Sequence, residues 1–166
     1  MFFYSIFQLM KTATIKELKD ELGHYSREEL LDYCLRMAKF KKENKELLTY
    51  LLFEASNEAH YIEGLKELID ERFSEINTSN YYHIKKSIRK ILREIKKHLR
   101  YSKNKETAVE LLIYFCQKLA LMRPSMNRSI ALQNIYQRQL ILIRKTIKTL
   151  DEDLQYDYGV ELDNLP

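Results

Sequence analysis

The scarcity of glycine and proline restricts this chain more than any other feature of its sequence. Only 3 Gly and 2 Pro occur in 166 residues. β-Sandwiches and barrels need these residues at their many turns, so an all-β fold is disfavoured. A chain of this length can bury one continuous core. We therefore predict an all-α protein with a single helical domain.

Apolar residues recur at helical spacing in about seven segments, which predicts about seven amphipathic helices. Two of them begin with a capping box, formed by Thr14 with Glu17 and by Ser26 with Glu29. The segment at about 105–122 is apolar on nearly every side, so we place it at the centre of the fold. The predicted helices span about 14–22, 26–40, 43–54, 57–76, 80–101, 105–122 and 127–152.

The short connections between these segments, roughly two to six residues long, make consecutive helices antiparallel neighbours. Two architectures satisfy this constraint. One is a compact antiparallel bundle. The other, which we slightly prefer, is a short α-α superhelix whose alternation of helix pairs is similar in rhythm to HEAT-type stacks. No internal repeat of fixed period supports that resemblance, and no motif assigns the chain to a family.

The two ends of the chain stand apart from the helical domain, which we assign to residues 14–152. Residues 1–13 are an uncertain N-terminal segment, because MFFYSIFQLM is apolar yet too short for a spanning helix and lacks the basic start of a signal peptide. Met10 begins a polar stretch, so one interpretation makes Met10 the true start; a short helix on the core and a weak membrane contact are the alternatives. Residues 153–166 are an acidic tail that we expect to be extended or partly disordered.

Charge is concentrated in one segment of the chain. Residues 1–80 hold 11 basic and 15 acidic side chains, 81–105 hold 10 basic and one acidic, and 106–166 hold 7 basic and 8 acidic. At about 100° per residue, the Ile and Leu residues of the helix at 80–101 share one face, and cations fill the adjoining arc of about 140° over about 22 Å. This predicted cationic stripe consists of Lys85, Lys86, Arg89, Lys90, Arg93, Lys96, Lys97 and Arg100, and Tyr82 points the same way.

The stripe repels itself, because each pair of like charges at i and i+4 destabilises an isolated helix by roughly 0.2–0.5 kcal/mol. We infer an acidic counterpart, for which three sources remain open. The first is internal pairing with the acidic helix at 57–76, or plain solvation. The second is the phosphates of nucleic acid. The third is an acidic protein, peptide or anionic membrane, and here the chain's own acidic tail could fold onto the stripe as an electrostatic autoinhibitor.

Signatures of catalysis or metal binding are weak in this sequence. Glu21 and His24 have the Glu-x-x-His spacing of carboxylate-bridged metal sites, but only one copy occurs, and Gly23 should end the helix before His24. We find no nucleophile elbow and no phosphate-binding glycine loop. The other histidines are interpreted as isolated surface or boundary residues: His60, His83 and His98.

These observations favour a non-catalytic, cytoplasmic module that binds another macromolecule, as an adaptor or scaffold, through the basic helix at 80–101. A nucleic-acid-binding protein that contacts phosphates through the same helix is the alternative, and an enzyme of unknown class is the second alternative. We predict no metal, no cofactor and no transmembrane segment. Cys34 and Cys116 lie in apolar runs and are expected to be buried thiols in a reducing compartment. The wide apolar stripe of the helix at 127–152 fits either a homodimer interface or a deep internal position.

Overall fold

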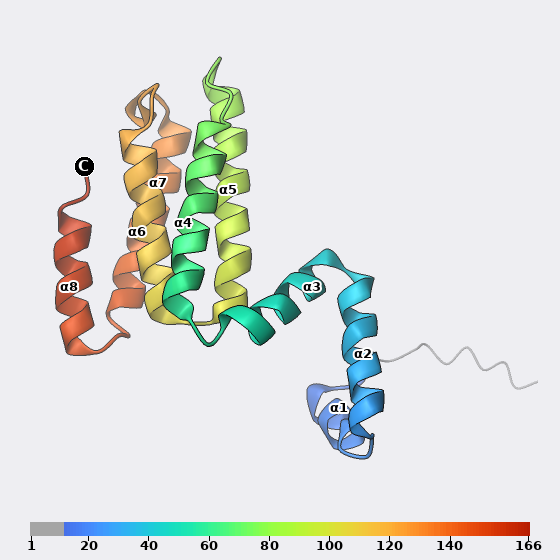
Figure 1. Cartoon of the computed structure of the whole chain (residues 1–166). Helices are drawn as coiled ribbons and strands as arrows, with labels where there is room; N and C mark the ends of the chain where they lie inside the picture. Colours follow the sequence, from blue (N-terminus) through green and yellow to red (C-terminus); the bar gives the residue numbers. More distant parts are fainter. Residues whose placement is uncertain (1–11) are drawn as a thin grey trace, which may run out of the picture. The chain divides into compact units, whose positions relative to one another are not determined.

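A computed structural model describes residues 12–166 of the chain. The chain divides into two compact units, one ending at Leu48 and the other beginning at Thr49 (Figure 1). This division differs from the single helical domain predicted for 14–152. The predictions for residues 1–9, including the start at Met10, lie outside the described residues.

The first unit contains three helices, α1 (Ile15–Leu22), α2 (Arg27–Phe40) and α3 (Lys42–Thr49), whose last residue belongs to the second unit. Both predicted capping boxes are confirmed: the Thr14 side chain accepts from the Glu17 amide, and the Ser26 side chain accepts from the Glu29 amide. In return, each glutamate accepts from the backbone amide of its cap residue, at 2.7 Å and 2.8 Å. These contacts form within one turn of chain, so they need no tertiary structure.

None of the described residues of the first unit is buried. The apolar stripes of its helices are exposed, with Ile15 at 81% and Phe40 at 79% of full accessibility. Cys34, predicted to be buried, is exposed as well. The apolar stripes of these helices are therefore not buried by other residues of this unit.

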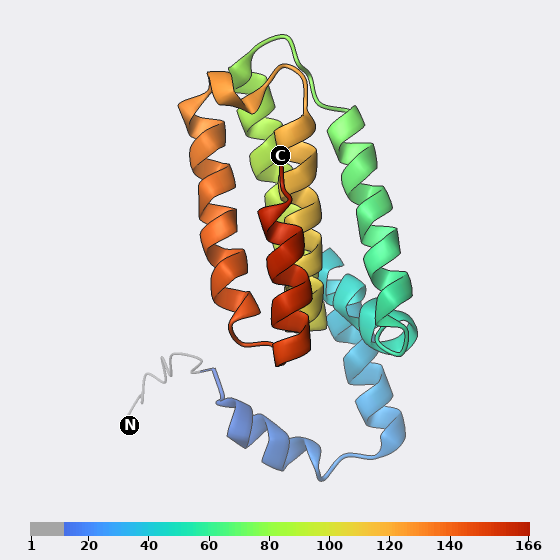
Figure 2. The same ribbon diagram turned by 90° about the vertical axis from the view of Figure 1, so that its left-hand side faces the viewer.

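The second unit is an antiparallel bundle whose helices run alternately up and down (Figures 1 and 2). It begins with a short π-helical segment, η1 (Tyr50–Glu54), that follows α3 directly. A short 3-10 turn, η2 (Met126–Arg128), precedes α7. The predicted all-α class is confirmed, and the bundle alternative describes this unit. Its α-helices are α4 (Glu58–Ser74), α5 (Tyr81–Ser102), α6 (Lys105–Leu121), α7 (Ile130–Ile147) and α8 (Glu152–Asp163).

Helix α6 lies at the centre of the bundle, as predicted from its nearly uninterrupted apolar sequence. It packs against α4, α5, α7 and α8, and it supplies more fully buried side chains than any other helix described. Helices with one neighbour need one apolar stripe, whereas α6 has neighbours around its circumference. The buried residues of α6 are Thr107, Val109, Leu111, Leu112, Ile113, Phe115, Cys116 and Leu119.

The apolar stripe of α7 is explained by its internal position. Its buried residues include Leu132, Ile135 and Ile143, which face the core that α6 organises. Ile141 remains 64% exposed, so the outermost residues of the predicted wide stripe are not covered. Most of the apolar stripe of α7 is therefore covered within one chain, and no homodimer is needed to explain it.

The acidic end of the chain forms helix α8, which corrects the expectation of an extended or partly disordered tail. The predicted last helix at 127–152 stops at Ile147, and α8 begins after a short turn. Tyr158 and Leu162 are buried, and the Tyr158 hydroxyl donates to Glu106 Oε1 of α6 at 3.2 Å. Leu154, Tyr158 and Leu162 recur every four residues. Three apolar positions in an acidic segment are too few to indicate a helix from the sequence alone.

Candidate anion-binding face

Helix α5 presents one apolar face to the bundle and one cationic face away from it. Asn80 caps its first turn by accepting from the His83 amide at 3.0 Å. The inner face is buried through Ile84, Ile88 and Ile91, together with Leu92 and Ile95. This matches the two arcs predicted from the sequence. On the outer face Lys86, Arg89, Lys90, Arg93, Lys96 and Arg100 are exposed, whereas Lys85 and Lys97 are partly buried.

The predicted stripe has almost no internal neutralisation. Within residues 12–166, no carboxylate oxygen lies within 4 Å of the side-chain nitrogens of Lys86, Arg89, Arg93 or Arg100, nor of those of Lys85, Lys90 and Lys96. Lys85 lies 5.8 Å from the centre of the Tyr82 ring, a cation-π contact on the same helix. Six exposed cations of the stripe therefore have no carboxylate oxygen within 4 Å among the described residues.

Several acidic residues of α4, the internal partners suggested by the sequence, bind cations outside the stripe. Asp70 pairs with Lys118 of α6 at 2.7 Å, and Lys66 bridges Glu63 at 2.9 Å and Glu110 of α6 at 2.7 Å. Two of these pairs join α4 to α6, and the Lys66–Glu63 pair lies within α4. Internal pairing with α4 therefore does not account for the cationic face.

Helix α8 does not reach the stripe either. It packs on α6 and α7 and lies at the opposite edge of the bundle from α5 in Figure 1; in Figure 2 it is in front, with α5 behind. The hypothesis that the acidic tail folds onto the stripe of its own chain is not met in this structure. The reason is that α8 is held by its buried residues Tyr158 and Leu162.

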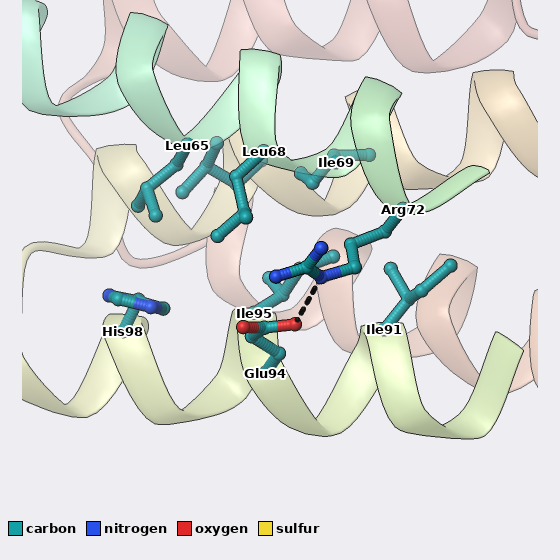
Figure 3. A pocket seen from close by; sticks show the side chains of 9 residues that line it. Leu65, Leu68, Ile69, Arg72, Ile91, Glu94, Ile95 and His98 are labelled. Atoms are coloured by element: carbon teal, nitrogen blue, oxygen red, sulfur yellow. Dashed lines mark hydrogen bonds and ion pairs between the residues drawn. The ribbon is translucent and has the colours of Figure 1, made fainter. Parts of the chain in front are cut away.

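A small apolar cavity lies between α4 and α5 (Figure 3). Its volume of about 10 Å³ is room for about one water molecule. Arg72 of α4 and Glu94 of α5 point toward each other across it, and Arg72 Nε donates to Glu94 Oε2 at 3.3 Å. Glu94 is the one acidic residue of the basic segment, and it is directed sideways to Arg72 and not outward. The cavity is far below the 300–1,000 Å³ of typical ligand sites.

A shallow hollow of about 330 Å³ occurs in the first unit, on α2 and α3. Its lining mixes rings and aliphatic chains with one guanidinium and one amide, and it brings no carboxylate, histidine or thiol together. The residues that line it are Tyr33, Arg36, Met37, Phe40 and Asn44.

A partly buried polar cluster surrounds Glu58 at the start of α4, and sequence reasoning missed it. Glu58 Oε2 accepts from the Tyr50 hydroxyl at 2.9 Å. Its Oε1 accepts from the Thr107 hydroxyl at 2.6 Å and from the Ser102 hydroxyl. Burial raises the pKa of Glu58, but the three hydroxyl donors outweigh burial and bring it below 4.5. Its donors lie up to 49 residues away, so no local motif could reveal it.

Beside this cluster, Tyr61 joins α4 to α5. The Tyr61 hydroxyl and His98 Nδ1 are 2.9 Å apart, and the Tyr50 and Tyr61 rings lie 4.7 Å apart between centres. Burial is the main cause that raises the pKa of Tyr61. His98, predicted to be a boundary residue, is partly buried and engaged with Tyr61. The contacts tie η1, α4, α5 and α6 together at one end of the bundle.

The Glu-x-x-His pair noted in the sequence gathers no further metal ligand among the described residues. Glu21 and His24 are both exposed, with His24 just beyond the end of α1. Among residues 12–166, no group of three or more His, Cys, Asp or Glu side chains is placed to hold a metal ion. Cys116 is buried in α6, as predicted, and burial raises the pKa of its thiol to about 12.

Comparison of the chain with protein-family models, with curated proteins and with solved structures found no match. Over the described part of the chain, each helix is too short or too polar to cross a lipid bilayer.

Proposed function

We propose that this chain is a non-catalytic module that binds an anionic macromolecule through the outer face of α5. The observation that supports the proposal is the set of outward cations that lack an anionic neighbour among the described residues. Such a face raises the local concentration of anions and speeds their encounter. Holding like charges along one helix costs stability in the isolated chain, and an anionic partner removes that cost.

One observation favours nucleic acid as the macromolecule. Apart from Tyr82, the outer face of α5 exposes no large apolar side chain. Protein interfaces are depleted of charge at their centre and anchored by aromatic and aliphatic residues. A phosphate backbone needs no such anchor, because Lys and Arg bind it by charge. The eight stripe cations occupy about 22 Å at 1.5 Å per residue, or one per roughly 2.8 Å, a spacing of the same order as the one phosphate per 3.4 Å along each strand of a duplex.

The first experiment measures binding of the full chain to labelled single- and double-stranded nucleic acid across a salt series. The test variant replaces Lys86, Arg89, Arg93 and Arg100 by glutamine, because all four are exposed and unpaired within the described chain. We expect log K of the wild type to fall linearly with log salt concentration. We expect the slope of the variant to be smaller by about 3–4 on a duplex, since each lost phosphate contact removes about 0.9.

A matched control separates this face from general positive charge. It replaces four other exposed cations by glutamine, so that its net charge equals that of the test variant: Arg128, Arg138, Lys145 and Lys148. We expect the control to keep most of its affinity. Equal losses in the two variants would contradict a dedicated face on α5. Binding of heparin with the same variant pattern, but no binding of nucleic acid, would retain the anion-binding face and reject nucleic acid as its ligand.

A further inference from the structure

Helix α8 carries an acidic row that mirrors the cationic row of α5. Asp153, Asp157 and Glu161 recur every four residues on its exposed side. Exposed apolar surface lies beside them, with Tyr156 at 73% and Val160 at 46% of full accessibility. Among residues 12–166, no cationic nitrogen lies within 4 Å of these three carboxylates. Asp153 and Asp157 are therefore as uncompensated as the stripe on α5, whereas Glu161 also lies within electrostatic range of Lys66 on α4 and Glu110 on α6.

The two rows have matching spacing. On α5, Lys85, Arg89 and Arg93 also recur every four residues, and a step of four residues is about 6 Å on any α-helix. Two helices laid side by side with this common step can bring several opposite charges together at once. Each exposed pair contributes little by itself, so the attraction is modest and depends strongly on salt.

The acidic row cannot meet the cationic row of its own chain. Both helices belong to the second unit, where α6 and α7 hold α8 at the opposite edge of the bundle from α5 (Figures 1 and 2). The buried Tyr158 and Leu162, and the hydrogen bond to Glu106, fix α8 there. The complementary surface available to α8 is therefore the α5 face of a second copy.

We propose that this protein self-associates head to tail, with the acidic row of α8 seated on the cationic face of α5 of the next copy. Because the two surfaces differ and lie at opposite edges of one bundle, the contact is heterologous and builds rings or open chains instead of a two-fold dimer. The proposal goes beyond the anion-binding function, although it uses the same α5 face. A second copy and an external polyanion then compete for that face.

Sedimentation velocity of the full chain across a concentration series tests the proposal. At about 0.02 M NaCl the screening length is roughly 20 Å, and at about 0.5 M it is roughly 4 Å. We expect the mean sedimentation coefficient to rise with protein concentration in the first condition and to stay constant in the second. A wild type that stays monomeric at low salt up to the highest soluble concentration would overturn the proposal.

Charge reversal identifies the two surfaces. The α8 variant Asp153→Lys, Asp157→Lys, Glu161→Lys and the α5 variant Lys85→Glu, Arg89→Glu, Arg93→Glu should each remain monomeric at low salt. Carrying both sets in one chain should restore the concentration dependence, because the charges are again opposite. Failure of the combined variant to associate, with its helical circular dichroism unchanged, would contradict the proposed pairing.

Two further variants guard against general charge effects and misfolding. Asp20→Lys, Glu28→Lys and Asp32→Lys change the net charge equally at exposed sites of the first unit and should leave association intact. Asp153→Asn, Asp157→Asn and Glu161→Gln preserve side-chain shape and should still abolish most of the association. Loss of association in the first set, or its persistence in the second, counts against the proposal.

Failure of this proposal is distinguishable from failure of the anion-binding function. The α8 variants keep the α5 face, so they should still bind heparin or nucleic acid. Polyanion binding without any self-association would reject the head-to-tail contact alone, whereas self-association without polyanion binding would reject the proposed function alone.

Discussion

At the scale of single residues, Glu58 is a carboxylate kept ionised by hydroxyl groups. No cation pairs with it among the described residues. Thr107, one of its three donors, is fully buried, and Tyr50 is nearly so. Hydroxyl donors buried beside a carboxylate lose their water, so their hydrogen bonds to it are costly to remove. The cluster therefore stabilises the junction of η1 with the bundle.

The first stability prediction concerns Glu58→Gln. We expect the substitution to lower the free energy of unfolding by about 1–3 kcal/mol at pH 7, because one amide group cannot accept from all three hydroxyls. The folded pKa of Glu58 lies below its usual 4.5. Its contribution is therefore complete above about pH 5.5 and is lost as pH falls through the folded pKa. Urea denaturation of the two proteins at a series of pH values measures the difference.

Glu67→Gln is the matched control for this prediction. Glu67 lies on the same helix, is exposed, and has no hydrogen bond or ion pair in the described structure. We expect its stability to follow the wild type within about 0.5 kcal/mol. A Glu58→Gln deficit that stays constant down to pH 3 would show that the carboxylate charge is not the source of the effect.

At the scale of elements, the end of α5 is strained. Lys103 caps the helix in the left-handed conformation, with φ of 56°, and its amide donates to the Leu99 carbonyl at 3.0 Å. Side chains with a Cβ carry a penalty there of roughly 1–2 kcal/mol that glycine avoids. Glycine is accordingly the residue that most often ends helices in this way.

We expect Lys103→Gly to raise the free energy of unfolding by about 0.5–1 kcal/mol, after the greater entropy of glycine in the unfolded chain is subtracted. Thermal and urea denaturation measure the change. Lys103→Ala removes the same charge without relieving the backbone, so it should leave stability unchanged or slightly lower. If alanine stabilises as much as glycine, then relief of charge repulsion along α5 is the cause and the backbone is not.

The elements that sequence analysis predicted are those whose signals are local. The capping boxes at Thr14 and Ser26 act within four residues, and the two faces of α5 follow from helical geometry alone. Helix α8 was missed because Tyr158 and Leu162 are stabilised by tertiary burial against α6 and α7. Propensity is a weak guide where packing decides.

The candidate site was predictable to a similar extent. The membership of the cationic face could be read from the sequence, but the partners of the α4 acids could not. Asp70 meets Tyr114 and Lys118, which lie more than 40 residues further along the chain. Such pairings depend on which helices become neighbours, and periodicity within one helix carries no information about that choice.

At the scale of the whole molecule, buried side chains are confined to one of the two units. Within residues 12–166, every buried residue falls between Tyr50 and Leu162. The sequence indicated one domain because apolar residues recur at helical spacing in the first three helices as well as in the later ones. Three short helices, however, leave their apolar stripes uncovered, since too few neighbours exist in that unit to cover them. Amphipathicity predicts a helix, but not that its apolar side is buried.

Each of the two units contains one cysteine. The rate at which a reagent modifies each thiol therefore reports on the exposure of that unit separately. Cys34 is exposed on α2, whereas Cys116 is fully buried in α6 with a thiol pKa raised to about 12. We expect a maleimide to label one thiol per chain rapidly in native buffer. Cys116 should react roughly 10³-fold more slowly or slower still, because labelling requires the core to open at a cost of about 5 kcal/mol or more.

Mass spectrometry of the labelled chain over time measures both rates, and Cys34→Ser should leave only the slow one. Rapid labelling of Cys116 in that variant would contradict a closed core around α6. If the expected rates hold, Cys34 is a natural attachment point for a dye on the first unit. Cys116 then reports transient opening of the core in the second unit. Motion of each unit can then be followed without introducing any new residue.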